Sequence, residues 1–218
     1  MLARMKQFLL PEGEAVARGL QTIRIFEKGE MRMSEQARWM PFTSEQTIQT
    51  CRSGFRWDAR TSGLVITDAY EESHGFAMSR LAGLLTLKKA TCGPELDRGE
   101  VQRYLASLLF CPAAIVNHPS LEWTAVAPSI LRVRDVSDPT GATVDFQIEP
   151  TGEPSACRTI RPRLIGKNAV DTPWLGKGSD FRLWNSMRVA HHLEVWWEIP
   201  EAPFCYYRSE VTRLDHTH

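Results

Sequence analysis

Carboxylates that lie among aromatic residues are the side chains of this sequence best suited to proton transfer. Glu45 follows Trp39 and Phe42 in one run, and Asp58 and Asp68 lie in the next two runs. An apolar surrounding raises the pKa of a carboxyl group, which suits a general acid or base near neutral pH. Carboxyl groups that meet across a sheet can also divide the acid and base roles. The alternative is an ordinary exposed sheet face with its usual polar residues.

His191 and His192 are the histidines with the best placement for chemistry. Neighbouring side chains of a regular strand point to opposite faces, so the two rings are not expected to hold one ion together. His192 shares its expected face with Glu194, and a carboxylate can orient an imidazole base. The alternative is a solvated histidine. We expect no metal, because the sequence has no H-E-x-x-H motif and no Cys or His pair at ligand spacing.

Aromatic residues are the second group of candidates, since the chain has seven tryptophans. Each indole offers a large apolar surface and one N–H group. Indoles on a concave sheet would bind an apolar or aromatic molecule, with a few polar groups that fix its orientation. For most of the seven, core packing is the alternative. The expected walls are Trp39, Trp57, Tyr70, Tyr104, Trp174 and Trp197, with Glu45 and Arg98 as polar anchors.

The elements that must position these residues are mostly strands. Short apolar runs separated by turn residues every eight to twelve positions are typical of an all-β protein. Two turns, 138–141 and 149–152, have Pro at the second position and Gly at the fourth, as type I turns prefer. They predict hairpins and therefore an antiparallel sheet. Strands are expected over 21–33, 40–50, 54–61, 64–72, 75–90, 121–127, 129–136, 142–149, 156–165, 178–185, 188–199 and 204–214.

One amphipathic helix interrupts the strands, and we expect it over about 98–110. Apolar residues recur from Val101 to Leu108 at the spacing of one helix face. Asp97 as N-cap and Glu100 three residues later form a predicted capping box. Pro112 stops this helix and can open a second short one through residue 117.

A long antiparallel sheet needs a cover for its apolar face, and this helix is the obvious candidate. The predicted fold is mostly β, of the α+β kind: a curved antiparallel sheet or half-barrel wrapped around one or two helices. We expect a single domain over 1–218, with a helical insertion at about 94–117 between two groups of strands.

Composition excludes several classes of protein. The 218 residues are 43% hydrophobic, and 26 basic residues balance 26 acidic ones. Zero net charge argues against nucleic acid as a main partner, because such binding needs uncompensated lysine and arginine. The apolar run at 8–10 is too short for a signal peptide or a membrane span. Five cysteines without ligand spacing indicate reduced thiols, and hence a cytoplasmic protein.

Three motifs in this order resemble an uncharacterised bacterial family known only as a domain of unknown function. They are Trp-Met-Pro-Phe-Thr-Ser-Glu-Gln at 39–46, Gly-Pro-Glu-Leu-Asp-Arg-Gly-Glu at 93–100 and Thr-Pro-Trp-Leu-Gly at 172–176. The resemblance covers nearly the whole chain and implies a single mostly-β domain. By analogy, that domain is similar to the open half-barrels of bacterial lipoprotein carriers, which hold acyl chains between sheet and helix. The resemblance implies no known reaction.

The sequence therefore predicts a protein that binds a hydrophobic or aromatic small molecule between a curved sheet and a helix. It has no glycine-rich phosphate loop, so we expect no cofactor. The alternative is a cofactor-independent acid–base enzyme of cyclase, isomerase or hydrolase type, acting on an apolar substrate in the same cavity. There Glu45, Asp58, Asp68 or His192 would move protons. A protein–protein adaptor that uses a sheet edge is a third option. The oligomeric state stays open.

Overall fold

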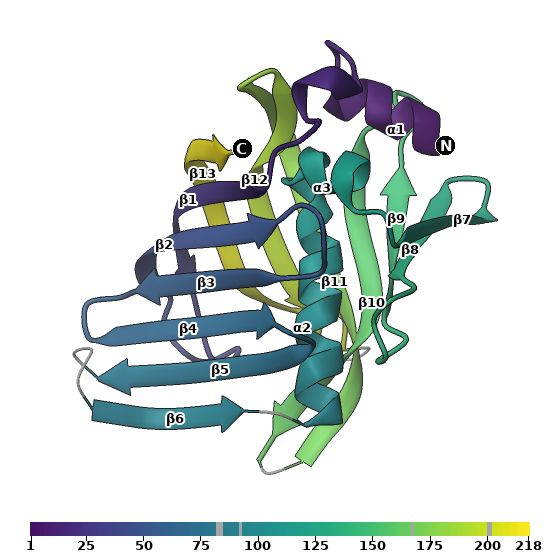
Figure 1. Cartoon of the computed structure of the whole chain (residues 1–218). Coiled ribbons are helices and arrows are strands. Elements are labelled where there is room, and N and C mark those ends of the chain that lie inside the picture. Colours follow the sequence, from purple (N-terminus) through teal and green to yellow (C-terminus); the bar gives the residue numbers. More distant parts are fainter. Residues whose placement is uncertain (82–84, 92, 167, 200–201) are drawn as a thin grey trace.

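A single antiparallel sheet of thirteen strands forms most of the computed structural model (Figure 1). The structure describes all residues except 82–84, 92, 167, 200 and 201. In spatial order the strands are β6-β5-β4-β3-β2-β1-β13-β12-β11-β10-β9-β8-β7. Their bounds are β1 Thr22–Met31, β2 Met40–Gln49, β3 Phe55–Arg60, β4 Leu64–Glu71, β5 His74–Leu81, β6 Leu85–Thr91, β7 Leu121–Ala127, β8 Ile130–Asp135, β9 Thr143–Ile148, β10 Pro154–Ile165, β11 Asn168–Trp184, β12 Met187–Trp197 and β13 Phe204–Thr217.

The sheet is open and curved, and its two arms follow the order of the chain. Strands β1–β6 form one arm by successive hairpins, and β7–β13 form the other. The arms join where β1 pairs with β13, so the first and last strands are neighbours in the middle of the sheet. The prediction of a mostly-β fold with a curved antiparallel sheet around helices is confirmed.

The helices between the two arms belong to one segment of the chain. They are α2 Pro94–Ala106, the 3-10 turn η2 Ser107–Leu109 and α3 Pro112–Asn117. Helix α2 packs against β4 and β5 of one arm and against β9 and β10 of the other (Figure 1). We call the sheet face turned toward α2 the inner face. Near the N-terminus lie α1 Leu2–Leu9 and the 3-10 turn η1 Glu14–Val16.

The prediction that the helix starts at about residue 98 is wrong, since α2 begins at Pro94. The predicted capping box of Asp97 and Glu100 is therefore wrong as well. Pro94 occupies the first turn, where its fixed φ and missing N–H suit a helix start, and Gly93 with φ 135° precedes it. Asp97 therefore lies inside the helix, where its carboxylate accepts a hydrogen bond from the Gly75 N–H at 2.6 Å. Glu100 is buried and contacts β10 instead of the helix end.

Two strand predictions also differ from the structure. The run predicted over 75–90 consists of two paired strands, β5 and β6, and residues 82–84 between them lie outside the described residues. Strand β11 begins ten residues before the predicted position 178, at Asn168. Pro173 and two nearby glycines are typical strand breakers, but here β10 and β11 continue together as one long hairpin.

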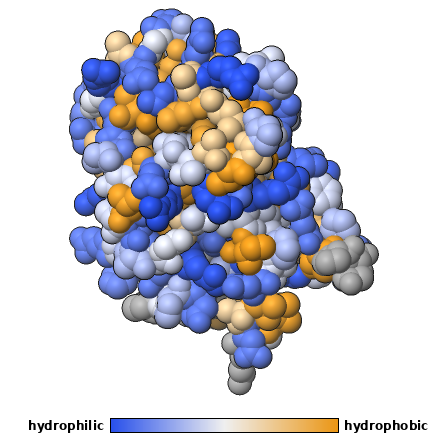
Figure 2. All heavy atoms as spheres, turned by 90° about the vertical axis from the view of Figure 1, so that its right-hand side faces the viewer, coloured by the Kyte–Doolittle hydropathy of each residue, from blue (hydrophilic) through white to orange (hydrophobic). Residues whose placement is uncertain are grey.

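The core lies between the inner face and the helices. Alternate residues of β1 and β9 are buried, which gives each of these strands one apolar side. On the face shown in Figure 2, hydrophobic and hydrophilic side chains are interspersed. Among the described residues, no helix is both long and apolar enough to cross a bilayer.

Candidate functional site

A cavity of about 240 Å³ lies between the inner face and the end of helix α2. Both arms of the sheet contribute walls, and α2 with η2 forms the roof. This volume is somewhat below the roughly 300–1,000 Å³ of typical small-molecule pockets. The apolar and aromatic lining residues are Met31, Met33, Trp57, Ile66, Ala106, Leu109, Phe110, Cys157, Trp174, Leu193, Val195, Tyr206 and Tyr207. Met33, Lys177 and Glu194 are exposed, so they mark the edge where the cavity meets solvent.

The roof is fixed to the sheet by a short chain of hydrogen bonds. Gln46 on β2 donates from Nε2 to Ser107 Oγ at 3.2 Å, and Ser107 donates to the Arg103 carbonyl at 2.9 Å. Gln46 and Ser107 are both buried. Because unpaired buried polar groups are costly, these bonds favour one position of the helix end over the cavity.

One wall of the cavity carries an ion pair that lies against an indole. Arg103 on α2 pairs with Asp68 on β4, and its guanidinium lies 4.6 Å from the centre of the Trp57 ring. Burial alone would lower the pKa of Arg103, but the carboxylates of Asp68 and Glu100 raise it above its ordinary value. The arginine therefore keeps its charge. The Trp57 Nε1–H is buried and has no partner among the described residues, so a bound molecule could accept its hydrogen bond.

A second polar group in the wall is the buried carboxylate of Glu27 on β1. It accepts hydrogen bonds from Ser209 at 2.6 Å, from Tyr207 at 3.1 Å and from Ser44 at 3.1 Å. Burial and then the charge of Glu27 raise the pKa of Tyr207 well above its ordinary value, so the phenol keeps its proton and donates it. Three hydroxyl donors thus replace the water that this carboxylate loses.

A second ion pair connects α2 to the other arm. Glu100 contacts Arg161 on β10 at 3.3 Å, and both side chains are largely buried. Burial raises the pKa of Glu100 from 4.5 to about 7, against the opposing effect of Arg161. The Arg161 guanidinium lies 5.7 Å from the centre of the Trp174 ring and lines the cavity. Ion pairs to Asp68 and Arg161 therefore tie helix α2 to both arms.

The raised pKa of Glu100 predicts a pH-dependent stability. Between about pH 4.5 and pH 7 the folded protein keeps a proton on Glu100 that the unfolded chain releases. Rising pH therefore favours the unfolded state in this window, by about 1.4 kcal/mol for each unit of pKa shift. Urea unfolding at pH 5 and pH 8 should show that the wild type loses stability relative to Glu100→Gln as the pH rises. The matched control is Glu95→Gln, because Glu95 is exposed on the same helix. If the stability of wild type and of Glu100→Gln changes equally with pH, the raised pKa is not that of Glu100.

The structure places two of the predicted aromatic wall residues in the cavity, Trp57 and Trp174. The Trp174 Nε1–H donates to the Tyr206 hydroxyl at 2.9 Å. Trp39 lies between the guanidinium groups of Arg32 and Arg208, and Trp197 stacks on Tyr206. Neither of these two indoles lines the cavity.

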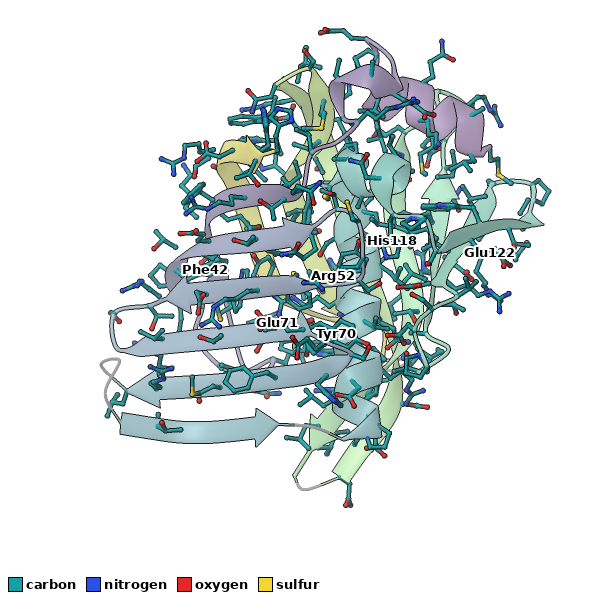
Figure 3. All side chains as sticks on the ribbon, in the orientation of Figure 1. Phe42, Arg52, Tyr70, Glu71, His118 and Glu122 are labelled. Atoms are coloured by element: carbon teal, nitrogen blue, oxygen red, sulfur yellow. The ribbon has the colours of Figure 1, made fainter. Side chains whose placement is uncertain are left out.

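Three other predicted ligand contacts lie elsewhere. Tyr70 and Tyr104 are core residues; Tyr70 (Figure 3) bonds to Asp138, and Tyr104 donates to the Gln49 carbonyl at 3.2 Å. Arg98 pairs with Asp171 and lines a separate shallow hollow instead of the cavity. The sequence alone could not distinguish aromatic residues that line the cavity from those that pack in the core. Aromatic residues of both kinds occur on the inner face, and only their neighbours in space decide between the two.

The four residues proposed for proton transfer do not form one group. Glu45 and Asp58 are register neighbours, but they lie on the outer face with arginine partners, Arg24 and Arg56. Asp68 lies on the inner face, because the register of β3 and β4 sets it opposite Trp57. The expectation that Asp68 approaches Glu45 is therefore wrong.

His192 lies on the outer face of β12, but the residues nearest to its ring do not include the predicted neighbour, Glu194. Asp180 lies 3.4 Å from its Nε2 and Glu210 lies 3.9 Å from its Nδ1, whereas Glu194 accepts a hydrogen bond from Trp196. The expectation that His191 and His192 stay apart is also wrong, since their ring centres are 4.6 Å apart.

Sequence reasoning missed the polar wall residues Glu27, Gln46, Arg103 and Ser107. Glu27 continues the alternation of Ile23 and Ile25, so its position on an apolar face was a usable signal. Residues 100, 103 and 107 have the spacing of one helix face and form a polar stripe on it. Sequence reasoning did not recognise this stripe, because Glu100 was interpreted as part of a capping box.

The open antiparallel sheet, the helices on its inner face and the cavity between them define an open half-barrel. A LolA superfamily protein from Nitrosomonas europaea superposes with a TM-score of 0.52 at 5% identity, covering 97% of this chain and 93% of the other. A putative outer membrane lipoprotein-sorting protein domain from Vibrio parahaemolyticus superposes with a TM-score of 0.51 at 7% identity, covering 97% of this chain and 93% of the other. A DUF1329 family protein from Desulfovibrio piger superposes with a TM-score of 0.51 at 8% identity, covering 95% of this chain and 92% of the other. At these identities the likeness shows the fold alone.

The chain itself belongs to a family of unknown function, DUF6920, whose pattern matches residues 4–216. No curated protein matches the sequence. The resemblance to an uncharacterised family and to the lipoprotein-carrier fold is thus confirmed.

Proposed function

We propose that this protein binds a lipophilic small molecule, such as an acyl chain or a ring compound, in the cavity beneath helix α2. The observation that carries the proposal is the cavity itself, which lies between both arms of the sheet and is lined mainly by apolar and aromatic side chains. Burial of apolar surface would supply most of the binding free energy. The unpartnered Trp57 N–H would favour a molecule with one hydrogen-bond acceptor.

The fold supports the same proposal. One structural neighbour is described as a lipoprotein-sorting domain, and lipoproteins carry acyl chains. Three charged groups of the wall already have partners: Asp68 pairs with Arg103, and Glu27 accepts hydrogen bonds from three hydroxyls. A ligand therefore needs few charges of its own.

The experiment that tests the proposal is native mass spectrometry of the full chain purified from a bacterial host. The expected result is a fraction of protein with a bound molecule of defined mass, which organic extraction releases. A fluorescent lipophilic probe should then bind the extracted protein and be displaced by the released molecule. Protein that carries no molecule and binds no lipophilic probe would overturn the proposal.

Glu45→Gln separates a carrier from the acid–base enzyme that the sequence left open. Glu45 is half-exposed on the outer face and paired with Arg24, so we expect a stability change of about 1 kcal/mol or less. Probe affinity should stay unchanged, because Glu45 does not line the cavity. Asp68→Asn is the informative comparison, since Asp68 does line it. Unchanged probe binding together with loss of a turnover found in the wild type would favour the enzyme. Loss of probe binding in Glu45→Gln would contradict a ligand site beneath α2.

The cytoplasmic location remains part of the proposal. It is supported by Cys51, Cys111, Cys157 and Cys205, which are free thiols. Cell fractionation with an antibody to the untagged protein would test it.

A further inference from the structure

Asp180, His191 and His192 form a group on the β11–β12 hairpin, away from the cavity. Each residue offers one ligand atom, and the three atoms lie within 4.8 Å of one another. The distance from His192 Nε2 to Asp180 Oδ2 is 3.4 Å. Two tetrahedral ligands at about 2.1 Å from one ion would be about this far apart.

The β11–β12 hairpin is locally irregular beside these side chains. Asp180 has a φ of 50°, in the left-handed region that non-glycine residues seldom adopt. The β11–β12 ladder is interrupted there: Ser179 pairs with His192 and Phe181 with Ala190, without a pair between them. The β12–β13 ladder begins only at His192. The ring of His191 nevertheless lies beside that of His192, with centres 4.6 Å apart.

One ring nitrogen of the group is buried and lacks a partner. His191 is 8% exposed, and its Nδ1 has no hydrogen-bond partner among the described residues. A buried polar atom without a partner is costly, and a bound metal ion would supply that partner.

We propose that Asp180, His191 and His192 bind a divalent transition-metal ion such as Zn²⁺. Two imidazoles and one carboxylate favour zinc, cobalt, nickel or copper over magnesium and calcium, which prefer oxygen ligands. Three protein ligands leave a coordination position for water or for an outside ligand. His192 also borders a broad, open groove, so that position would be reachable from solvent.

The surroundings of the group predict which changes weaken the site and which strengthen it. Glu210 lies 3.9 Å from His192 Nδ1 and can orient this ring, although it also pairs with Lys28. Arg182 contacts Asp180 at 2.6 Å and competes with a cation for the carboxylate. Removal of the arginine charge should therefore tighten metal binding.

The test is a titration of the full chain, expressed without a histidine tag, with Co²⁺ followed by absorption and with Zn²⁺ followed by calorimetry. We expect one ion per chain. Asp180→Asn and His192→Gln should each weaken binding by at least about tenfold. Arg182→Gln should tighten it several-fold, a change that a purely structural role of the group would not produce.

His216→Gln with His218→Gln is the matched control, because these two rings are also close, with centres 5.6 Å apart. Asp180 and His192 are partly exposed, so their variants should fold, and circular dichroism checks this. Binding that survives Asp180→Asn and His192→Gln, or that is lost only in the control, would overturn the proposal. So would a wild type that binds neither ion.

Discussion

Replacing Arg161 with methionine is expected to lower the free energy of unfolding by about 3–5 kcal/mol at pH 8. Arg161 is the ion-pair partner of Glu100 in the described part of the chain, and the Glu100 carboxylate is almost fully buried. Without the guanidinium, that carboxylate loses its direct ion pair and keeps only the more distant charge of Arg103. At pH 5 the loss should be smaller, because Glu100, with a pKa of about 7 in the wild type, is then protonated. Urea unfolding at both pH values measures the effect.

Two further variants define the cause of this loss. Arg98→Met removes an arginine whose pair with Asp171 is partly exposed, and should cost about 1 kcal/mol or less. The double variant Arg161→Met with Glu100→Met should recover most of the lost stability, since a well-packed apolar pair can replace a buried ion pair. An Arg161→Met protein as stable as Arg98→Met would show that the Glu100–Arg161 pair contributes nothing.

Filling the cavity from its roof is expected to abolish most of the lipophilic binding. Ala106 is buried at the end of α2 and lines the cavity, so Ala106→Trp would place an indole in the space of about 240 Å³. We expect the affinity for a lipophilic fluorescent probe to fall by at least about tenfold, or 1.4 kcal/mol. The stability should fall by no more than about 1–3 kcal/mol, the usual cost of overpacking.

The matched control is Ala125→Trp, which makes the same change on an exposed residue of β7. It should leave probe affinity unchanged. If Ala106→Trp folds and binds the probe as tightly as the control does, the ligand site is not beneath α2.

The fold could be predicted because its signals are local. Alternation along 142–149 and the two proline turns are properties of short segments, and they specify an antiparallel sheet without long-range information. The helix was predicted from the spacing of Val101 to Leu108. Its first residue was not, because Asp97 satisfies the pattern of a cap while Pro94 and Gly93 provide the actual start.

The site was harder to predict because it depends on register and on strand distortion. Trp57 and Trp174 were recognised as aromatic, but only the pairing of distant strands shows that they border the same void. Asp68 and Asp58 look equivalent in the sequence, and the register of β3 with β4 sends them to opposite faces. His191 was placed by the alternation of a regular strand, which does not reveal that its ring lies beside that of His192.

The pairing of β1 with β13 has a consequence for how the protein is made. β1 is synthesised before the other strands of this sheet, yet one of its two partner strands, β13, is synthesised after all of the others. Until then the two halves have no shared ladder, and an unprotected edge of β1 is open to wrong partners. Contacts so distant in the chain slow folding. Nascent chains that stall before residue 204 should therefore be the forms most dependent on chaperones.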